Sequence, residues 1–345
     1  MSLALGYPPL SCDGVSWRIL LEDFQTAYQQ LCQGKKIQLP AKTTSFKEWS
    51  HRLQEYAQSS VLDSELEYWL ISKRQSIKPI PVDYQCGNNT EATACTVSVS
   101  LSEEETQVLL QQVPTAYRTQ INDILLTALT QTFAQWTGEN SLLIDLEGHG
   151  REELFEDVDL SRTVGWFTSI FPVNLSLENA TSPGKALMAI KEQLRAIPNR
   201  GIGYGVLHYL SRDKEITSRL SLLPKAEVIF NYLGQFDQVL PESSLFRYAQ
   251  ESSGPSHSLC SLQTHLLEIN GSIFQGRLQM NWTYSEKLHR QTTIEGLAQG
   301  FIQGVRSLIA HCQSPDAGGF SPSDFADVEL SQEKLDNALA EIDFF

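Results

Sequence analysis

The period of the hydrophobic pattern switches repeatedly between that of a strand and that of a helix, and this switching restricts the possible folds more than any other feature. Between residues 96 and 312, short apolar runs bounded by turn residues alternate with longer runs that repeat every three to four residues. The expected strands lie at 96–101, 141–147, 167–177, 225–233, 261–270 and 273–284. One expected helix starts directly after Ser102, and three more cover 119–137, 183–196 and 289–312. Helices interleaved with strands predict an α/β protein, specifically an α+β two-layer sandwich.

Further helices are expected towards both ends of the chain. Apolar residues repeat at helical spacing in three amino-terminal segments, 14–33, 46–56 and 62–70. The stretch 78–95 has turn residues and no period, and is expected to be a linker. After residue 314, prolines and glycines interrupt regular structure until Ser331, which can cap a short helix or precede a frayed end. The chain therefore divides into 1–90, 91–313 and 314–345.

Composition excludes several classes of function. The chain has 26 basic and 41 acidic residues, and its net charge of −15 argues against nucleic-acid binding, which needs a basic surface. No apolar stretch reaches membrane length, and the first residues lack the features of a signal peptide, so we expect a cytoplasmic protein that does not bind membranes. The six cysteines are scattered without a CxxC pair, which predicts reduced thiols and no metal site.

A polar knot at the end of the expected strand 141–147 is the first candidate for chemistry. It reads Glu147-Gly148-His149-Gly150-Arg151-Glu152. Side chains alternate along a strand, so Asp145, Glu147 and His149 are expected on one face. Glycines on either side of an ionisable group leave room around it, which suits a general acid or base. A polar exit from a strand into a loop is the alternative interpretation.

Four motifs in a fixed order give the knot a wider context. They are Asp13-Gly14, Arg162-Thr163-Val164-Gly165-Trp166-Phe167-Thr168, Pro198-Asn199-Arg200-Gly201-Ile202-Gly203-Tyr204-Gly205 and Phe230-Asn231-Tyr232-Leu233-Gly234-Gln235-Phe236-Asp237. Together with the knot, they resemble the epimerization domains of nonribosomal peptide synthetases, which belong to the condensation-domain superfamily. The resemblance covers roughly residues 10–315. It implies a chloramphenicol-acetyltransferase-like architecture of two lobes with the active site between them.

One departure from the family pattern bears directly on activity. Family members carry His-His-x-x-x-Asp-Gly, and their second histidine is regarded as catalytic. Here the matching stretch is Pro8-Pro9-Leu10-Ser11-Cys12-Asp13-Gly14, so Pro9 occupies the position of that histidine. Only seven residues precede the motif, which predicts an incomplete amino-terminal lobe, with 1–90 as its remnant and 91–313 as the carboxy-terminal lobe. A one-base deletion in a split synthetase gene would explain the change, and substitution by chance is the alternative.

The resemblance implies a role for each remaining candidate residue. Glu147 matches a family glutamate that is thought to act together with the second histidine, one residue removing the substrate's Cα proton and the other returning a proton to the opposite side. Proline cannot replace that histidine because it has no titratable group. Asp13 is expected to cap a helix or to pair with Arg151 and brace the site. His149 is expected to orient its neighbours or to be structural. Residues matching family positions near the substrate are Asn231, Tyr232 and Tyr204.

Two of these assignments keep a simpler alternative. Asn231 can be a turn residue and Tyr232 half-buried packing. Arg162 follows Asp159 closely and can form only a surface ion pair, worth under about 1 kcal/mol. The glycines around Tyr204 do not predict a nucleotide site, because no P-loop lysine accompanies them.

The function implied by the resemblance is isomerisation of an L-aminoacyl or L-peptidyl thioester to its D form. The substrate would be tethered by phosphopantetheine to a carrier protein domain, and the chain itself would bind no cofactor and no metal. With Pro8-Pro9 in place of the histidines, we expect impaired activity from the chain alone. The alternatives are a complementing fragment that needs a separately encoded amino-terminal piece, a non-catalytic remnant, and a condensation domain that forms peptide bonds. The sequence identifies neither the amino acid nor the peptide product.

Overall fold

Six strands form one mixed sheet in the computed structural model, which describes residues 12–71, 77–178, 180–235, 246, 254, 257–325 and 331–342. The strands are β1 (Ala94–Ser100), β2 (Ser141–Gly148), β3 (Ser169–Ser176), β4 (Val228–Gln235), β5 (Leu267–Phe274) and β6 (Arg277–Ser285). Their order across the sheet is β1-β6-β5-β4-β2-β3. β4 runs parallel to both β2 and β5, and the other neighbours are antiparallel. The mixed α/β fold expected from the sequence is thus confirmed.

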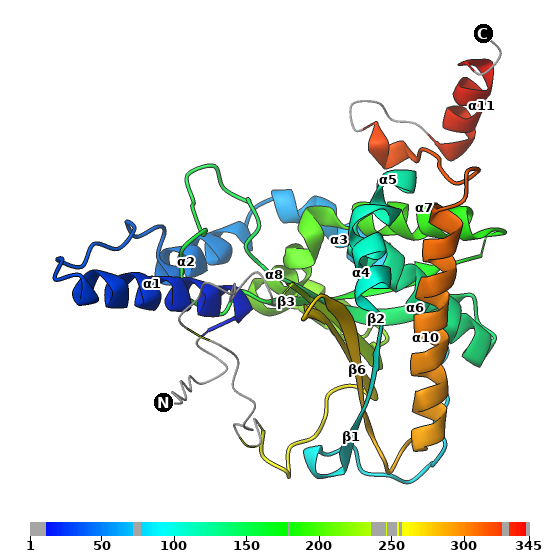
Figure 1. The fold of residues 1–345 in the computed structure, drawn as a ribbon, viewed down its shortest axis with the longest axis horizontal. Coiled ribbons are helices and arrows are strands. Elements are labelled where there is room, and N and C mark those ends of the chain that lie inside the picture. The colour runs from blue at the N-terminus through cyan, green and yellow to red at the C-terminus, as the bar shows by residue number, and fades with distance from the viewer. Residues whose placement is uncertain are drawn as a thin grey trace.

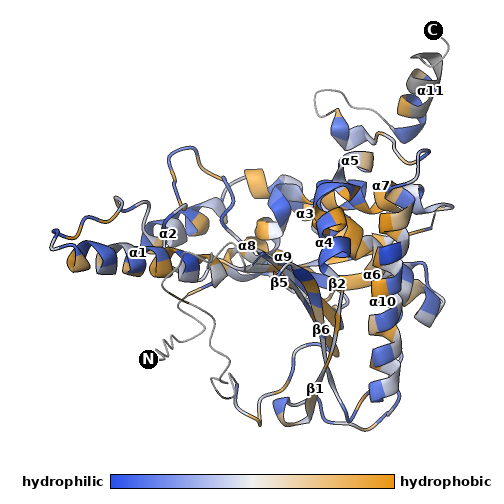
Figure 2. Cartoon of the chain, viewed as in Figure 1, coloured by the Kyte–Doolittle hydropathy of each residue, from blue (hydrophilic) through white to orange (hydrophobic). Residues whose placement is uncertain are grey.

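Helices cover one face of this sheet and enclose the main hydrophobic core. α6 packs against α10, and α10 also contacts β1 and β6 (Figure 1). The helices of this layer are α4 (Glu103–Gln111), α5 (Val113–Tyr117), α6 (Ile121–Thr137), α7 (Pro183–Arg195) and α10 (Gln291–Cys312). α6 is largely hydrophobic along its length (Figure 2), and its Ile124, Leu125 and Leu129 have no exposed surface. Burial of this apolar layer is the main driving force for the fold.

The opposite face of the sheet is polar. Along β5, Leu267, Ile269 and Ile273 point into the core and are buried, whereas Glu268 and Asn270 alternate to the other side. Thr96 and Thr283 share this second face on β1 and β6, where their hydroxyls hydrogen-bond at 3.1 Å. On the side away from α6 and α10, the strands β1, β5 and β6 therefore present hydrogen-bonding groups, whereas the exposed Ile170 of β3, in register with Glu147, adds an apolar group.

Three amino-terminal helices lie beside the sheet, and the third joins the main core through Leu62 and Trp69. They are α1 (Gly14–Cys32), α2 (Phe46–Tyr56) and α3 (Val61–Ile71), and all three match segments expected to be helical. α1 extends away from the body of the molecule (Figure 1), and its Phe24, Tyr28 and Leu31 are exposed. α2 is held by a small second core in which Trp49 meets Leu160, Phe167 and Ile202. The carboxy-terminal helix α11 (Gln332–Ile342) starts after Ser331, as expected.

Three parts of the chain differ from the sequence-based expectation. The strand expected from residue 261 begins only at Leu267. The expected break between the last two strands lay near residue 271, but the β5–β6 turn is at Gln275-Gly276, which both have positive φ angles. The helices α8 (Ile202–Leu210) and α9 (Lys214–Ser221) were not predicted, because the glycine-rich start of α8 suggests a loop. Gly203 sits in α8 because a side chain there would collide with the carboxylate of Glu65.

One edge of the sheet carries a proline. Within the part of the chain that the structure describes, β3 pairs with β2 alone, and Pro172 lies in the middle of β3, opposite Asp145. The register of β3 with β2 continues without a break on both sides of this residue. Proline is tolerated at sheet edges, where its missing N–H is not needed by a neighbouring strand. All six cysteines are free thiols, and no helix in the described ranges is long and apolar enough to cross a membrane.

Candidate functional site

Glu147 lies at the end of β2 on the polar face of the sheet, and its carboxylate is held by a partner from the next strand. Asn231 of β4 donates a hydrogen bond from its Nδ2 to Oε2 of Glu147 over 2.6 Å. Gly148 follows Glu147, and a side chain at that position would meet Ser169 Oγ at 2.9 Å. The glycine therefore lets the end of β2 lie close to the start of β3 next to the carboxylate.

The surroundings of Glu147 shift its acid–base equilibrium. Burial raises the pKa of the Glu147 carboxyl, and repulsion from Glu268 raises it further, while the Asn231 hydrogen bond and the charge of His265 act in the opposite direction. Burial disfavours the ionised carboxylate because it removes water from the charge. A carboxyl with a raised pKa can both accept and return a proton closer to neutral pH than an ordinary glutamate.

A histidine–carboxylate pair lies beside Glu147. His265 Nε2 is 2.8 Å from Oδ2 of Asp145, and Nδ1 of His265 is 2.9 Å from the hydroxyl of Thr264. Asp145 precedes Glu147 by two residues, so both project from the same face of β2. The alternation along the strand predicts Asp145 on this face, but no sequence motif indicates His265 or Glu268. The alternation of polar residues after 267 is the signal that could have placed Glu268 here.

Three of the sequence motifs meet at a second, buried ion pair. Arg151 Nη2 donates to both oxygens of Asp13, at 3.1 and 3.2 Å, and to Ser16 Oγ at 3.1 Å. Only 8% of the Arg151 side chain and 4% of the Asp13 side chain are exposed. Asp13 also caps α1 by accepting a hydrogen bond from the backbone N–H of Ser16. Both expectations for Asp13, the cap and the pair with Arg151, are present together.

Arg151 also ties down the loop that follows the knot. Its Nη1 donates to the carbonyl oxygens of Leu160 and Thr163, each at 2.8 Å. Its guanidinium lies 3.9 Å from the centre of the Phe167 ring, a cation–π contact. The Gly165 N–H donates to Ser16 Oγ, and the Ser16 hydroxyl donates to the carbonyl oxygen of Gly165. Arg151 thus links the start of α1 to the loop 160–167 through hydrogen bonds to both.

His149 and Arg162 do not lie where the sequence suggested. His149 follows the end of β2, so it does not share a strand face with Glu147. Its Nδ1 accepts a hydrogen bond from the Arg151 backbone, and its Nε2 lies 3.4 Å from Glu152. Arg162 pairs with Glu22 and Asp23 of α1 and not with Asp159. Its role is to attach the loop to α1, because both contacts bridge these two elements.

Tyr232 and Tyr204 belong to the core side of the sheet. Tyr232 follows Asn231 in β4 and therefore points to the opposite face, where it is partly buried against the main core. Burial raises the pKa of Tyr232 to about 12, so its hydroxyl stays protonated at neutral pH. Tyr204 of α8 packs on Trp69, with ring centres 5.2 Å apart. Of the residues expected near the substrate, Asn231 alone is placed at Glu147. Pro8 and Pro9 lie outside the described residues.

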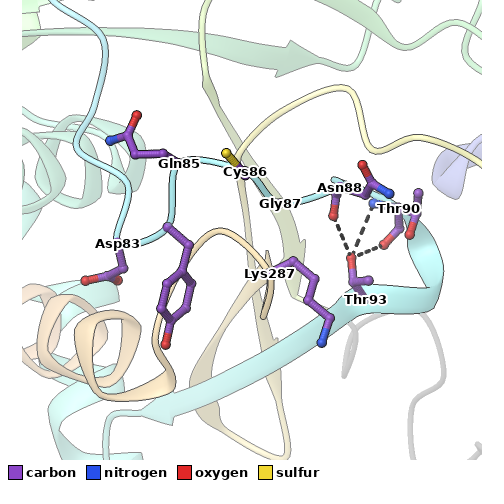
Figure 3. A pocket seen from close by; sticks show the side chains of 9 residues that line it. Asp83, Gln85, Cys86, Gly87, Asn88, Thr90, Thr93 and Lys287 are labelled. Carbon is purple, nitrogen blue, oxygen red and sulfur yellow. Dashed lines mark hydrogen bonds between the residues drawn. The ribbon is translucent and has the colours of Figure 1, made fainter.

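A cavity of about 620 Å³ lies far from this group of residues. Its lining residues are Asp83, Tyr84, Gln85, Cys86, Gly87, Asn88, Thr90, Thr93 and Lys287 (Figure 3). They sit where β6 ends and β1 begins, which is the opposite end of the sheet from the carboxyl end of β2. Among the described residues, no cluster of histidine, cysteine, aspartate or glutamate is arranged to hold a metal ion. The Glu147 group therefore remains the candidate site on chemical grounds.

Replacing Glu147 with glutamine is expected to stabilise the fold at neutral pH by about 1 kcal/mol. The folded-state pKa of Glu147 is raised above the usual value of 4.5, so the native state becomes less stable as pH rises through that pKa and the buried group ionises. Glutamine stays neutral and can still accept the Asn231 hydrogen bond. Thermal unfolding at several pH values checks this: the gain should be present at pH 7–8 and vanish below the ordinary glutamate pKa. An equal gain at all pH values would contradict the assignment.

Comparison with known proteins identifies the family. The model of the condensation domain matches residues 10–331, and the chain belongs to the condensation-domain family. It is 50% identical over 334 residues to one of the linear gramicidin synthase proteins from Brevibacillus parabrevis, and 40% identical over 337 residues to gramicidin S synthase 1 from Brevibacillus brevis. These alignments cover 96% and 95% of the chain but only 4% and 30% of the two synthetases, so the chain corresponds to a small part of each.

Solved structures show the same fold. The epimerization domain from the third module of tyrocidine synthetase B superposes with a TM-score of 0.82 at 38% identity, over 88% of this chain and 67% of that domain. The first condensation domain of the CDA synthetase gives a TM-score of 0.62 at 15% identity, over 88% of this chain and 64% of that domain. The first likeness is much the stronger in both sequence and shape.

Proposed function

We propose that this chain is the Glu147-bearing part of an epimerization domain that converts a carrier-bound L-aminoacyl or L-peptidyl thioester to its D form. The observation that carries the proposal is the buried Glu147 carboxyl, held by Asn231 on the polar face of the sheet, with its pKa raised. The similarity to the tyrocidine synthetase epimerization domain supports the same function. The phosphopantetheine arm of the carrier belongs to the substrate, and the chain itself holds no cofactor in this proposal.

The reaction needs one proton removed and another delivered. A Glu147 oxygen takes the proton from Cα, and the electrons of the broken C–H bond move onto the thioester oxygen to form an enolate. A second acid on the other side of the carbon returns a proton to Cα, which inverts the centre. Asn231 fixes the direction of the Glu147 carboxylate by its hydrogen bond. In the family pattern the second acid is the histidine at the position of Pro9, so we propose that the chain as it stands lacks this acid and that its activity is impaired.

The second candidate is peptide-bond formation, because the matching family model is that of the condensation domain. The two functions differ in what they require. Epimerization needs one loaded carrier and produces a D residue, whereas condensation needs a second carrier bearing an amine and produces a longer peptide. Products can therefore separate them directly.

The test restores the missing group and follows the product. The Pro8→His/Pro9→His variant, supplied with the amino-terminal part of a related epimerization domain, is mixed with a carrier loaded with an L-aminoacyl or L-peptidyl thioester. We expect D product and uptake of solvent deuterium at Cα without any amine acceptor, and a rate at least about 10²-fold lower with Pro8-Pro9 retained. Chiral chromatography and mass spectrometry measure both. Peptide formation with an acceptor carrier and no D product would favour condensation, and equal rates for both forms would refute the role of position 9.

A further inference from the structure

A line of amide side chains crosses the polar face of the sheet, starting at Glu147. Asn231 of β4 is in register with Asn270 of β5, and Asn270 with Asn281 of β6. We call these three residues the asparagine row. Ser98 of β1 continues it opposite Asn281. Because neighbouring strands are about 4.8 Å apart, the line leads about 19 Å away from Glu147.

Asparagine is a poor choice for these positions if the sheet alone is considered. It is depleted in strands, where β-branched and aromatic residues are preferred. Two residues further along β1 and β6, on the same face, Thr96 and Thr283 provide a polar surface with residues that suit strands. Three asparagines in register on adjacent strands therefore run against local preference. Departures of this kind are expected where a function constrains the residue.

The hydrogen bonds within the row leave one donor and one acceptor beside each other. Asn270 Nδ2 donates to Glu268 Oε1 over 2.7 Å, and Asn281 Oδ1 accepts from the Ser98 hydroxyl, also over 2.7 Å. Within the described residues, the side-chain carbonyl oxygen Oδ1 of Asn270 and the side-chain amino group Nδ2 of Asn281 have no protein partner. An acceptor next to a donor matches the N–H and C=O of a peptide group. Asn270 and Asn281 are half-buried and Ser98 is exposed, so a ligand can reach them.

We propose that the asparagine row binds the backbone of a peptidyl thioester, so that the substrate is a peptide and not a single amino acid. This inference rests on the proposed function and specifies its substrate class. Asn270 is two strand spacings from Glu147, about 10 Å, which an extended peptide covers in about three residues. An aminoacyl group whose Cα is held at Glu147 has no peptide group that reaches so far. A peptide places its upstream amides along the row.

Binding to the full chain tests the proposal without relying on turnover. Two probes are compared: pantetheine joined by an amide bond to L-alanine, and pantetheine joined to an acetylated tetrapeptide that ends in L-alanine. We expect the tetrapeptide probe to bind at least about tenfold more tightly, the effect of one or two hydrogen bonds. Asn270→Val and Asn281→Val should each remove most of this preference, because valine has no amide. Calorimetric titration or ligand-observed NMR gives the dissociation constants.

Thr283→Val is the matched control, because Thr283 lies on the same face of β6 two residues from Asn281 and outside the asparagine row. This variant should keep the preference for the tetrapeptide probe. Valine favours strands, so the variants are expected to fold, which circular dichroism verifies. Equal affinities for the two probes, an unchanged preference in both asparagine variants, or no binding of the tetrapeptide probe at millimolar concentration would each overturn the proposal. Glu147→Gln should leave the preference intact. If the histidine-restored protein with Glu147 in place keeps the preference but forms no D product, the proposed function alone is wrong. If it forms D product without the preference, the assignment of the asparagine row alone is wrong.

Discussion

Glu147→Gln is expected to lower Cα proton exchange by about 10²–10⁴-fold in the histidine-restored, complemented protein, the usual loss when a general acid–base group is removed. Glutamine keeps the shape of the side chain and can accept the Asn231 hydrogen bond, but it cannot take a proton. Folding should be unharmed, because the substitution removes a buried ionisable group. Solvent deuterium uptake at Cα, measured by mass spectrometry, gives the rate. Exchange that continues unchanged would mean that Glu147 is structural.

Glu268→Gln is the matched control for this experiment. Glu268 raises the pKa of Glu147 by charge repulsion, so its neutralisation should lower that pKa. The base form of Glu147 would then be present at lower pH, and the rising limb of the exchange profile should move to lower pH with most of the activity retained. A loss as large as that of Glu147→Gln would contradict this division of roles. A profile that does not move would show that the two carboxylates are not coupled.

Arg151→Leu is expected to destabilise the protein by about 3–5 kcal/mol, because it leaves the buried carboxylate of Asp13 without a counter-charge. The change also removes donors from Ser16 and from the carbonyl oxygens of Leu160 and Thr163. Urea unfolding followed by fluorescence measures the effect. The matched control is Arg52→Leu, which removes an ion pair of similar length with Asp157 at 2.8 Å, on the surface. That variant should lose under about 1 kcal/mol.

The double variant Asp13→Asn/Arg151→Leu separates the ion pair from packing. Asparagine still caps a helix, but it carries no charge that needs a partner. We therefore expect the double variant to be more stable than Arg151→Leu alone. If the two changes simply add, the loss comes from packing or the backbone contacts, and the interpretation of Arg151 and Asp13 as a charge pair is wrong.

The spacing of apolar residues and the capping residues predicted most of the helices and strands, because packing in the folded protein agrees with these local preferences. Ser102 begins α4 with a reciprocal capping interaction to Glu105, as its position before three glutamates indicated. The β5–β6 hairpin shows where such rules fail. Asn270-Gly271 is a preferred turn pair, but it lies inside β5, where Gly271 is opposite Met280 of β6 and a side chain at Gly271 would meet Met280 Sδ at 2.7 Å. Packing against β6 therefore determined the register.

Site residues that lie within one continuous sequence motif could be predicted, whereas site residues that only the folded sheet brings together could not. Glu147 was found because glycines surround it, and the partners Asp13 and Arg151 were paired by family resemblance. His265 lies 120 residues from Asp145 in sequence and in no motif, so only the sheet order could bring them together. For Tyr232 the sequence left two possibilities, a substrate contact or half-buried packing, and the structure places both Tyr232 and Tyr204 against the main core. A motif shows which residues are adjacent in sequence, but not which side of the sheet each faces.

The proline in the edge strand β3 has a consequence for behaviour at high protein concentration. A sheet edge with a full set of N–H and C=O groups is a template on which strands of other molecules can add. Proline has no backbone N–H, so β3 offers no hydrogen-bond donor at Pro172. An incoming strand would find a gap in the middle of an eight-residue edge. This edge is thereby protected against intermolecular sheet growth, the first step towards fibrils.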